Sequence, residues 1–173
     1  MKSLTKEKML EAFKALDEAL GSTTRLIIGG GGAMILAHHF RLGTADVDGI
    51  AVGVDPAEFD SCVKKVAKKL SLPGDWLNPY YSTFTHVLPQ DYGSRLLLVC
   101  EFSKLKVLAL SKEDLLIMKC FAGRQKDILH AKALIKQGAN LKLVEGQLEW
   151  LKERRIPGTD NAMTFLDDIL DQV

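Results

Sequence analysis

The sequence predicts an α/β fold of the α+β type, with a mixed sheet, followed by a helical C-terminal part. Three patterns carry this prediction. Short apolar runs alternate with amphipathic helical stretches over residues 1–110, and a glycine-rich turn at 29–32 joins one apolar run to the next helix. Helical periodicity then dominates 111–173. This order is typical of a domain that packs helices on a sheet. We therefore expect a core at 1–110 and a helical part at 111–173, within one compact unit.

The individual elements follow from hydrophobic spacing and from turn residues. Helices are expected where apolar residues recur every three or four positions, at 5–20, 33–40, 55–70, 111–121, 126–136, 141–154 and 161–170. Strands are expected for the shorter apolar or β-branched runs at 25–28, 47–54, 83–88, 95–102 and 106–110. Residues 72–79 contain several turn formers and are predicted to be a loop.

The composition excludes several classes of protein. The chain is 47% hydrophobic, enough to form a core, and its formal net charge of +1 creates no general attraction to nucleic acid or to an anionic membrane. No apolar run approaches the roughly 20 residues of a membrane span. The first residues form a charged amphipathic pattern that differs from a signal peptide. We expect a cytoplasmic protein.

The glycine turn is the first candidate binding element. An apolar run at 25–28 leads into four consecutive glycines, and an apolar helical segment follows them. Glycines such as Gly30 and Gly31 allow backbone to approach a phosphate, and the next helix presents free N–H groups to the anion. The alternative interpretation is a tight strand-to-helix turn with no ligand.

Asp46 and Asp48 form the second candidate element. They stand two positions apart at the predicted start of a strand, so their side chains share one face of the sheet. Two such carboxylates suit Mg²⁺, which takes its remaining ligands from substrate phosphates. The alternative is an exposed strand end with two solvated acids, but the nearby glycine turn favours the metal site. Arg41 and Thr44 precede the acids and are candidate contacts to phosphate or ribose.

Lys119 and Asp127 are a third candidate pair. Lys119 interrupts the apolar run 115–118, where a lysine must either reach solvent or meet an anion. On a continuous helix, Asp127 would fall within one quadrant of Lys119, although Gly123 predicts a bend between them. In the functional interpretation Lys119 neutralises triphosphate charge and Asp127 orients it. The alternative is a surface lysine and an aspartate that begins a helix.

Together these motifs resemble the nucleotidyltransferase superfamily, whose polymerase-β-like core carries a glycine pair and an Asp-x-Asp metal motif. The matching stretches are Gly-Gly-x-Ala at 30–33 and Thr-x-Asp-Val-Asp at 44–48. Ser-x-Glu-Asp-Leu-Leu-x-x-Lys at 111–119 and Ala-Gly-Arg-x-Lys-Asp at 122–127 are similar to the signature of the branch that contains abortive-infection type toxins. Pro-x-Asp-Trp-Leu-Asn at 73–78 resembles a segment of the small uncharacterised proteins of that branch.

The resemblance implies Mg²⁺-dependent transfer of a nucleoside monophosphate from an NTP, with release of pyrophosphate. It places the metal on Asp46 and Asp48, and the triphosphate on the glycine pair. Lys119 and Asp127 match the functional Lys and Asp of the family, and Arg124 is either a phosphate contact or a tie between helices. The toxin relatives imply a tRNA, another RNA or a protein side chain as acceptor, and a cognate antitoxin as partner.

The resemblance also implies a third acid on a later strand. Glu101 is the one candidate, with a salt-bridge partner at a sheet edge as its alternative role. The lack of a clear third acid leaves a second hypothesis open, a catalytically inactive member that binds nucleotide or protein. A dinucleotide-binding oxidoreductase fits less well, since paired acids suit a metal better than a ribose.

Overall fold

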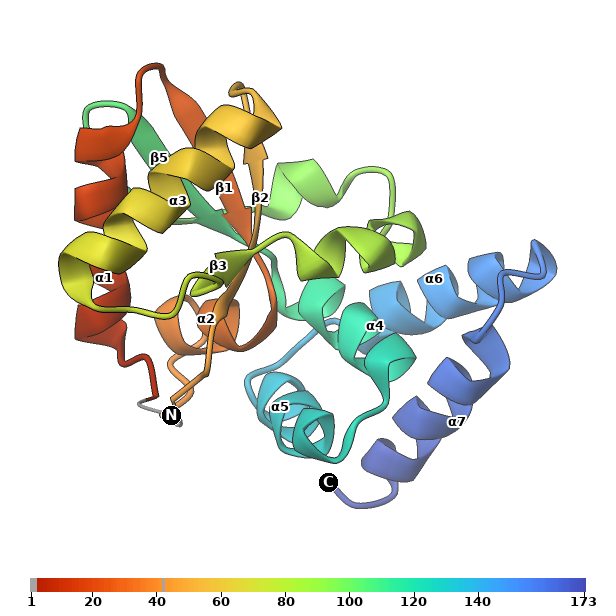
Figure 1. The fold of residues 1–173 in the computed structure, drawn as a ribbon. Helices are drawn as coiled ribbons and strands as arrows, with labels where there is room; N and C mark the ends of the chain where they lie inside the picture. The colour runs from red at the N-terminus through yellow and green to blue at the C-terminus, as the bar shows by residue number, and fades with distance from the viewer. Residues whose placement is uncertain (1–2, 42) are drawn as a thin grey trace. The chain divides into compact units, whose positions relative to one another are not determined.

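The computed structural model describes residues 3–41 and 43–173, and this part of the chain divides into two compact units. The first unit contains the chain up to Ser82 together with Leu96–Leu110. The second contains Thr83–Arg95 and Ser111–Val173. Figure 1 shows the elements of both units, coloured along the chain.

The first unit is built on a five-stranded mixed sheet with strand order β3-β2-β1-β5-β4. Its strands are β1 (Thr24–Ile28), β2 (Val47–Val52), β3 (Leu77–Asn78), β4 (Leu97–Glu101) and β5 (Leu105–Ala109). The central strand β1 pairs antiparallel with β2 and parallel with β5. At the two edges, β3 runs parallel to β2, and β4 runs antiparallel to β5. The predicted α/β fold with a mixed sheet is therefore confirmed.

Helices α1 (Lys6–Ala19), α2 (Gly30–Leu36) and α3 (Pro56–Leu70) complete the first unit. Both long helices begin at a capping side chain, because Thr5 accepts a hydrogen bond from the backbone of α1 and Asp55 accepts two from α3. α1 and α3 pack against each other, and α3 crosses in front of the sheet in Figure 1. Their apolar stripes bury residues such as Phe13 and Val63, and this burial holds the helices on the sheet.

The second unit is helical. It contains α4 (Lys112–Ala122), α5 (Gln125–Lys136), α6 (Leu141–Glu153) and α7 (Thr159–Leu170), and α4 packs against the other three. α4 begins at the cap Ser111, and Arg95 donates to the buried Asp114 carboxylate beside that cap. Turn residues separate the helices, as the sequence predicts, with Gly123 in the left-handed region at φ +55°.

Three local predictions were wrong. Residues 80–87 form the 3-10 helix η1 where a strand is predicted at 83–88. From residue 81 on, the less exposed side chains are Tyr81, Phe84, Thr85 and Val87, a spacing close to the three-residue period of a 3-10 helix and unlike the alternation of a strand. The predicted loop 72–79 contains the short strand β3, and α2 begins at Gly30, inside the glycine run.

Among the described residues, no helix combines the length and the apolar character that crossing a membrane requires.

Candidate active site

The glycine turn lies directly against the acid pair within the first unit. The Gly29 N–H donates to the Asp48 carbonyl at 2.9 Å. Gly30 has φ +54°, and a Cβ there would lie 2.0 Å from Asp48 Oδ2. A Cβ on Gly31 would lie 2.7 Å from Thr44 Oγ1. Both positions therefore require glycine, and the turn and the strand that follows it form one site.

Asp46 and Asp48 flank the start of β2 and share one face. Val47 between them is fully buried, whereas both aspartates are half-buried, so the chain alternates as a strand should. The Asp46 carboxylate accepts a hydrogen bond from Asn78 Nδ2 at 3.0 Å. The Thr44 hydroxyl donates to the Asp46 carbonyl at 3.0 Å and orders the approach to the strand. Sequence reasoning missed Asn78, although it belongs to the Trp-Leu-Asn segment that the family resemblance includes.

The residues at this site fit a divalent cation. Two carboxylates on one strand supply the hard oxygen ligands that Mg²⁺ prefers. No side chain separates Asp48 from the glycine backbone, because the space that a Cβ of Gly30 would fill is taken by the Asp48 carboxylate. Within residues 3–41 and 43–173, no three His, Cys, Asp or Glu side chains cluster as a metal site. The described site is thus a two-carboxylate site, and a bound ion would take its other oxygen ligands from water, backbone or substrate.

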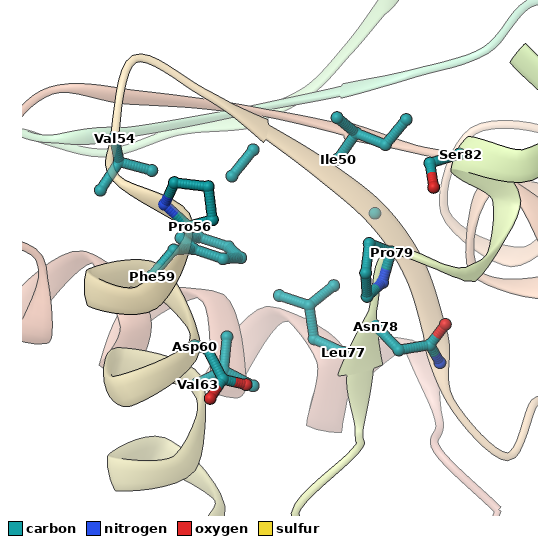
Figure 2. A pocket seen from close by; sticks show the side chains of 12 residues that line it. Ile50, Val54, Pro56, Phe59, Asp60, Val63, Leu77, Asn78, Pro79 and Ser82 are labelled. Atoms are coloured by element: carbon teal, nitrogen blue, oxygen red, sulfur yellow. The ribbon is translucent and has the colours of Figure 1, made fainter.

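A mostly apolar hollow of about 250 Å³ opens beside the acid-bearing strand, and Figure 2 shows the side chains that line it. Its walls come from β2 beyond Asp48, from Val54, from α3, and from Leu77, Asn78, Pro79 and Ser82. Phe59 and Leu77 supply apolar walls, and Asn78 supplies one of the polar groups. Asn78 therefore belongs both to the hollow and, through its hydrogen bond to Asp46, to the acid pair. Apolar walls with a few polar groups are typical of ligand pockets.

Two predicted site residues lie apart from this cluster. Arg41 is exposed and lines a separate hollow with Lys6 and His39, to which neither acid contributes. Glu101 lies on the edge strand β4, in register with Lys106 of β5, which it meets in an ion pair of 3.5 Å.

The sheet register shows how far Glu101 is from the acid pair. Lys106 pairs with Arg25, at the start of β1, whereas Asp48 stands beside Gly29, just past the end of β1. Glu101 is therefore at the opposite end of the sheet from Asp48, and strands β1 and β5 lie between β4 and β2. Its contacts support the salt-bridge role.

In the second unit, Lys119 and Asp127 form a buried ion pair. Lys119 Nζ lies 2.6 Å from Asp127 Oδ1, and the two residues are 3% and 0% exposed, so the alternative of a surface lysine is wrong. Arg124 donates to the same carboxylate through Nε at 2.8 Å and through its backbone N–H at 3.2 Å. The bend at Gly123 brings the start of α5 back to α4. Burial opposes ionisation of Asp127, but hydrogen bonds from Arg124 and the charge of Lys119 outweigh it and lower the pKa of Asp127.

His130 lies at the edge of this cluster, with Nδ1 at 3.9 Å from Asp127 Oδ1. Burial, and then the positive charge of Lys119, lower the pKa of His130 to about 4. The imidazole is therefore neutral at neutral pH. With two cations against one carboxylate, the cluster carries a net charge of +1, and the Arg124 side chain is its 46% exposed member.

The mixed sheet with its helices is consistent with a nucleotidyltransferase-like α+β fold. The chain belongs to a family described as nucleotidyltransferases of unknown function (DUF6036), whose model matches residues 7–151. The match spans the sheet, the acid pair and the Lys119–Asp127 pair. Neither a curated protein nor a solved structure matches the chain significantly.

Replacing Asp127 by Asn will destabilise the protein strongly, because it leaves the Lys119 ammonium buried beside a neutral amide. We expect the free energy of unfolding to fall by about 3–5 kcal/mol, measured by urea denaturation at neutral pH. Asp60→Asn is the matched control, since Asp60 forms an exposed pair with Lys64, and its cost should stay below about 1 kcal/mol. Equal losses in the two variants would contradict the structural role of the buried pair.

His130 makes stability depend on pH. Its pKa is about 4 in the folded chain and near 6.5 in the unfolded chain, so the unfolded chain binds the extra proton between these values. The free energy of unfolding should therefore decrease as the pH falls from about 6.5 towards 4. In His130→Gln this slope should be smaller, as chemical denaturation at a series of pH values will measure. Parallel curves for the two proteins would show that His130 is not buried as described.

Proposed function

We propose that the protein is an active, Mg²⁺-dependent nucleotidyltransferase that transfers a nucleoside monophosphate from an NTP to an RNA or protein acceptor. One observation supports this more than any other. The Asp48 carboxylate occupies the space beside the Gly30 backbone, so the candidate phosphate-binding turn and the candidate metal ligands form a single site. Family membership supplies the reaction class.

In the proposed reaction, an acceptor hydroxyl attacks the α-phosphorus. The new bond joins the acceptor oxygen to the α-phosphorus, the bond to the bridging oxygen breaks, pyrophosphate leaves, and the hydroxyl proton passes to solvent or to a nearby base. A Mg²⁺ ion held by Asp46 and Asp48 would stabilise the charge on the phosphates. The first N–H groups of α2 have no acceptor within the helix and are suited to the triphosphate, next to Gly30 and Gly31.

The predicted site residues other than the acids and the glycines have smaller roles in this proposal. Thr44 orders the chain before Asp46, and its hydroxyl lies close to Gly31, so its contribution is to shape the turn. Arg124 is a candidate phosphate contact because it is the exposed cation of a cluster with net positive charge. Lys119 is already paired with Asp127, so we propose a structural role for this pair. It positions the Arg124 side chain and stabilises the bend between α4 and α5. Arg41 stays a prediction from the sequence alone.

The acceptor and the partner are proposed from the resemblance to toxin nucleotidyltransferases. A tRNA is our first candidate acceptor, with another RNA or a protein side chain as the others, and a cognate antitoxin is the proposed partner. One observation favours the second hypothesis, a non-catalytic nucleotide- or protein-binding module: the described residues offer two clustered carboxylates rather than three. The same experiment separates the two functions.

The test is label transfer by the purified chain, incubated with Mg²⁺, total cell RNA or lysate, and each NTP labelled at the α-phosphorus. We expect label in a macromolecular fraction with α-labelled NTP and none with γ-labelled NTP. Asp48→Asn should reduce transfer by about 100-fold or more, because loss of a metal ligand removes several kcal/mol of charge stabilisation. Nuclease and protease digestion of the product then identify the acceptor class.

Asp75→Asn is the control, since this exposed carboxylate precedes β3 and takes no part in the site. Transfer from γ-labelled NTP would indicate a kinase instead. Binding of NTP and Mg²⁺ without transfer to any acceptor would favour the non-catalytic module.

A further inference from the structure

The segment Trp76–Pro79 is fixed beside the acid pair by several contacts with the core of the first unit. Trp76 is fully buried, its Nε1 donates to the Val63 carbonyl at 3.1 Å, and its own carbonyl accepts from the Val47 N–H at 2.7 Å. The Trp76 ring also packs against Phe13, with ring centroids 6.2 Å apart. Pro79, which has no N–H, follows Asn78 and ends the strand. The segment is therefore a rigid strand of two residues fixed beside Asp46 and Asp48.

Leu77 and Asn78 point to opposite faces of this strand. Leu77 is buried, and a Cβ on Gly49 would lie 2.8 Å from its side chain, so Leu77 faces the core. Asn78 is the register partner of Asp48 and therefore shares the face of the two acids. Its Nδ2 donates to Asp46 Oδ2 at 3.0 Å. The amide is thus a third polar group at the acid pair, brought there by an adjacent strand.

We propose that Asn78 is a positioning residue for the divalent cation site. It holds the Asp46 carboxylate towards Asp48, and it places a neutral amide beside the two carboxylates. This inference rests on the proposed function. Asp46 precedes β2 and is not held by the sheet itself, and two neighbouring carboxylates repel each other. The hydrogen bond from Asn78 restrains the Asp46 side chain, and it offsets part of the repulsion between the two carboxylates.

Because the Asn78 amide is neutral, it also limits the negative charge of the site and so its affinity for a free cation. Two carboxylates give the site a charge of −2, whereas an aspartate at position 78 would give −3. A site with fewer charged ligands binds a free cation more weakly and depends more on oxygens that a substrate brings. The proposal therefore specifies the metal–NTP complex, rather than the free ion, as the species that this site recognises.

The test exchanges the two partners of the hydrogen bond. Mn²⁺ affinity is measured on the full chain by the loss of the free-ion EPR signal, with and without a non-hydrolysable NTP analogue. Asp46→Asn should weaken Mn²⁺ binding by about 10-fold or more. The double variant D46N/N78D restores two carboxylates and one amide and reverses the donor, so its affinity should return to within about 3-fold of the original chain.

Two single variants complete the design. Asn78→Ala removes the donor and should weaken Mn²⁺ binding by about 10-fold, in line with other outer-shell partners of metal ligands. Asn78→Asp adds a third carboxylate and should strengthen binding of the free ion. Asn140→Asp is the matched control for charge, because Asn140 caps α6 through its side-chain oxygen, which an aspartate retains. It should leave Mn²⁺ affinity unchanged.

The outcomes separate this inference from the proposed function. If the original chain binds Mn²⁺ and Asn78→Ala binds it equally tightly, the positioning role of Asn78 is wrong while the site stands. If D46N/N78D binds no better than Asp46→Asn, position 78 does not share the site with the two acids. If the original chain binds no Mn²⁺ even with the analogue, the proposed function fails. In that case Mn²⁺ binding by the Asn78→Asp variant alone tests whether Asn78 lies beside the two acids. A new Mn²⁺ site would support the shared position of the three side chains, and no site would overturn it.

Discussion

The approach of the Asp48 carboxylate to the Gly30 backbone is the contact on which the account of the first unit depends. Any side chain at position 30 would overlap Asp48 Oδ2, and the positive φ of Gly30 disfavours other residues for a separate reason. The contact joins the end of β1, the start of α2 and the start of β2 in one cluster. It follows that the glycine run does more than turn the chain, since it lets the Asp48 carboxylate approach the first residue of α2.

The second unit depends on a different constraint, a charge pair that is removed from water. Desolvating Lys119 and Asp127 is costly, and the arrangement holds only because Arg124 adds further hydrogen bonds to the same carboxylate. The cluster also joins two helices across the bend at Gly123. A buried ionic cluster of this kind gives the α4–α5 turn a defined geometry, and it leaves the Arg124 guanidinium partly exposed.

Much of this arrangement is predictable from the sequence because its signals are local. Apolar residues at helical spacing place the helices near 5–20, 55–70 and 111–121, and the two-residue spacing of Asp46 and Asp48 places both on one face. The sequence narrowed Lys119 to two outcomes, contact with solvent or with an anion, and the structure shows the contact with an anion. The family resemblance added the reaction class, which the comparison of family models supports.

The features that sequence reasoning missed depend on contacts between distant segments. Asn78 is 32 positions from Asp46, lies on a strand of two residues and is not an acid, so a search for carboxylates passes over it. Glu101 is an acid on a real strand, but only the sheet register shows that it lies at the other end of the sheet. Residues 83–88 have the composition of a strand, yet their burial follows a three-residue period that composition does not reveal.

The most direct measurement of the central claim is a crystal structure of the chain soaked with Mn²⁺ and a non-hydrolysable NTP analogue, with anomalous diffraction used to locate the metal. The account predicts an anomalous peak coordinated by carboxylate oxygens of both Asp46 and Asp48, with the triphosphate against the backbone of Gly30 and Gly31. A metal bound elsewhere, or a triphosphate that leaves the glycine turn empty, would contradict it.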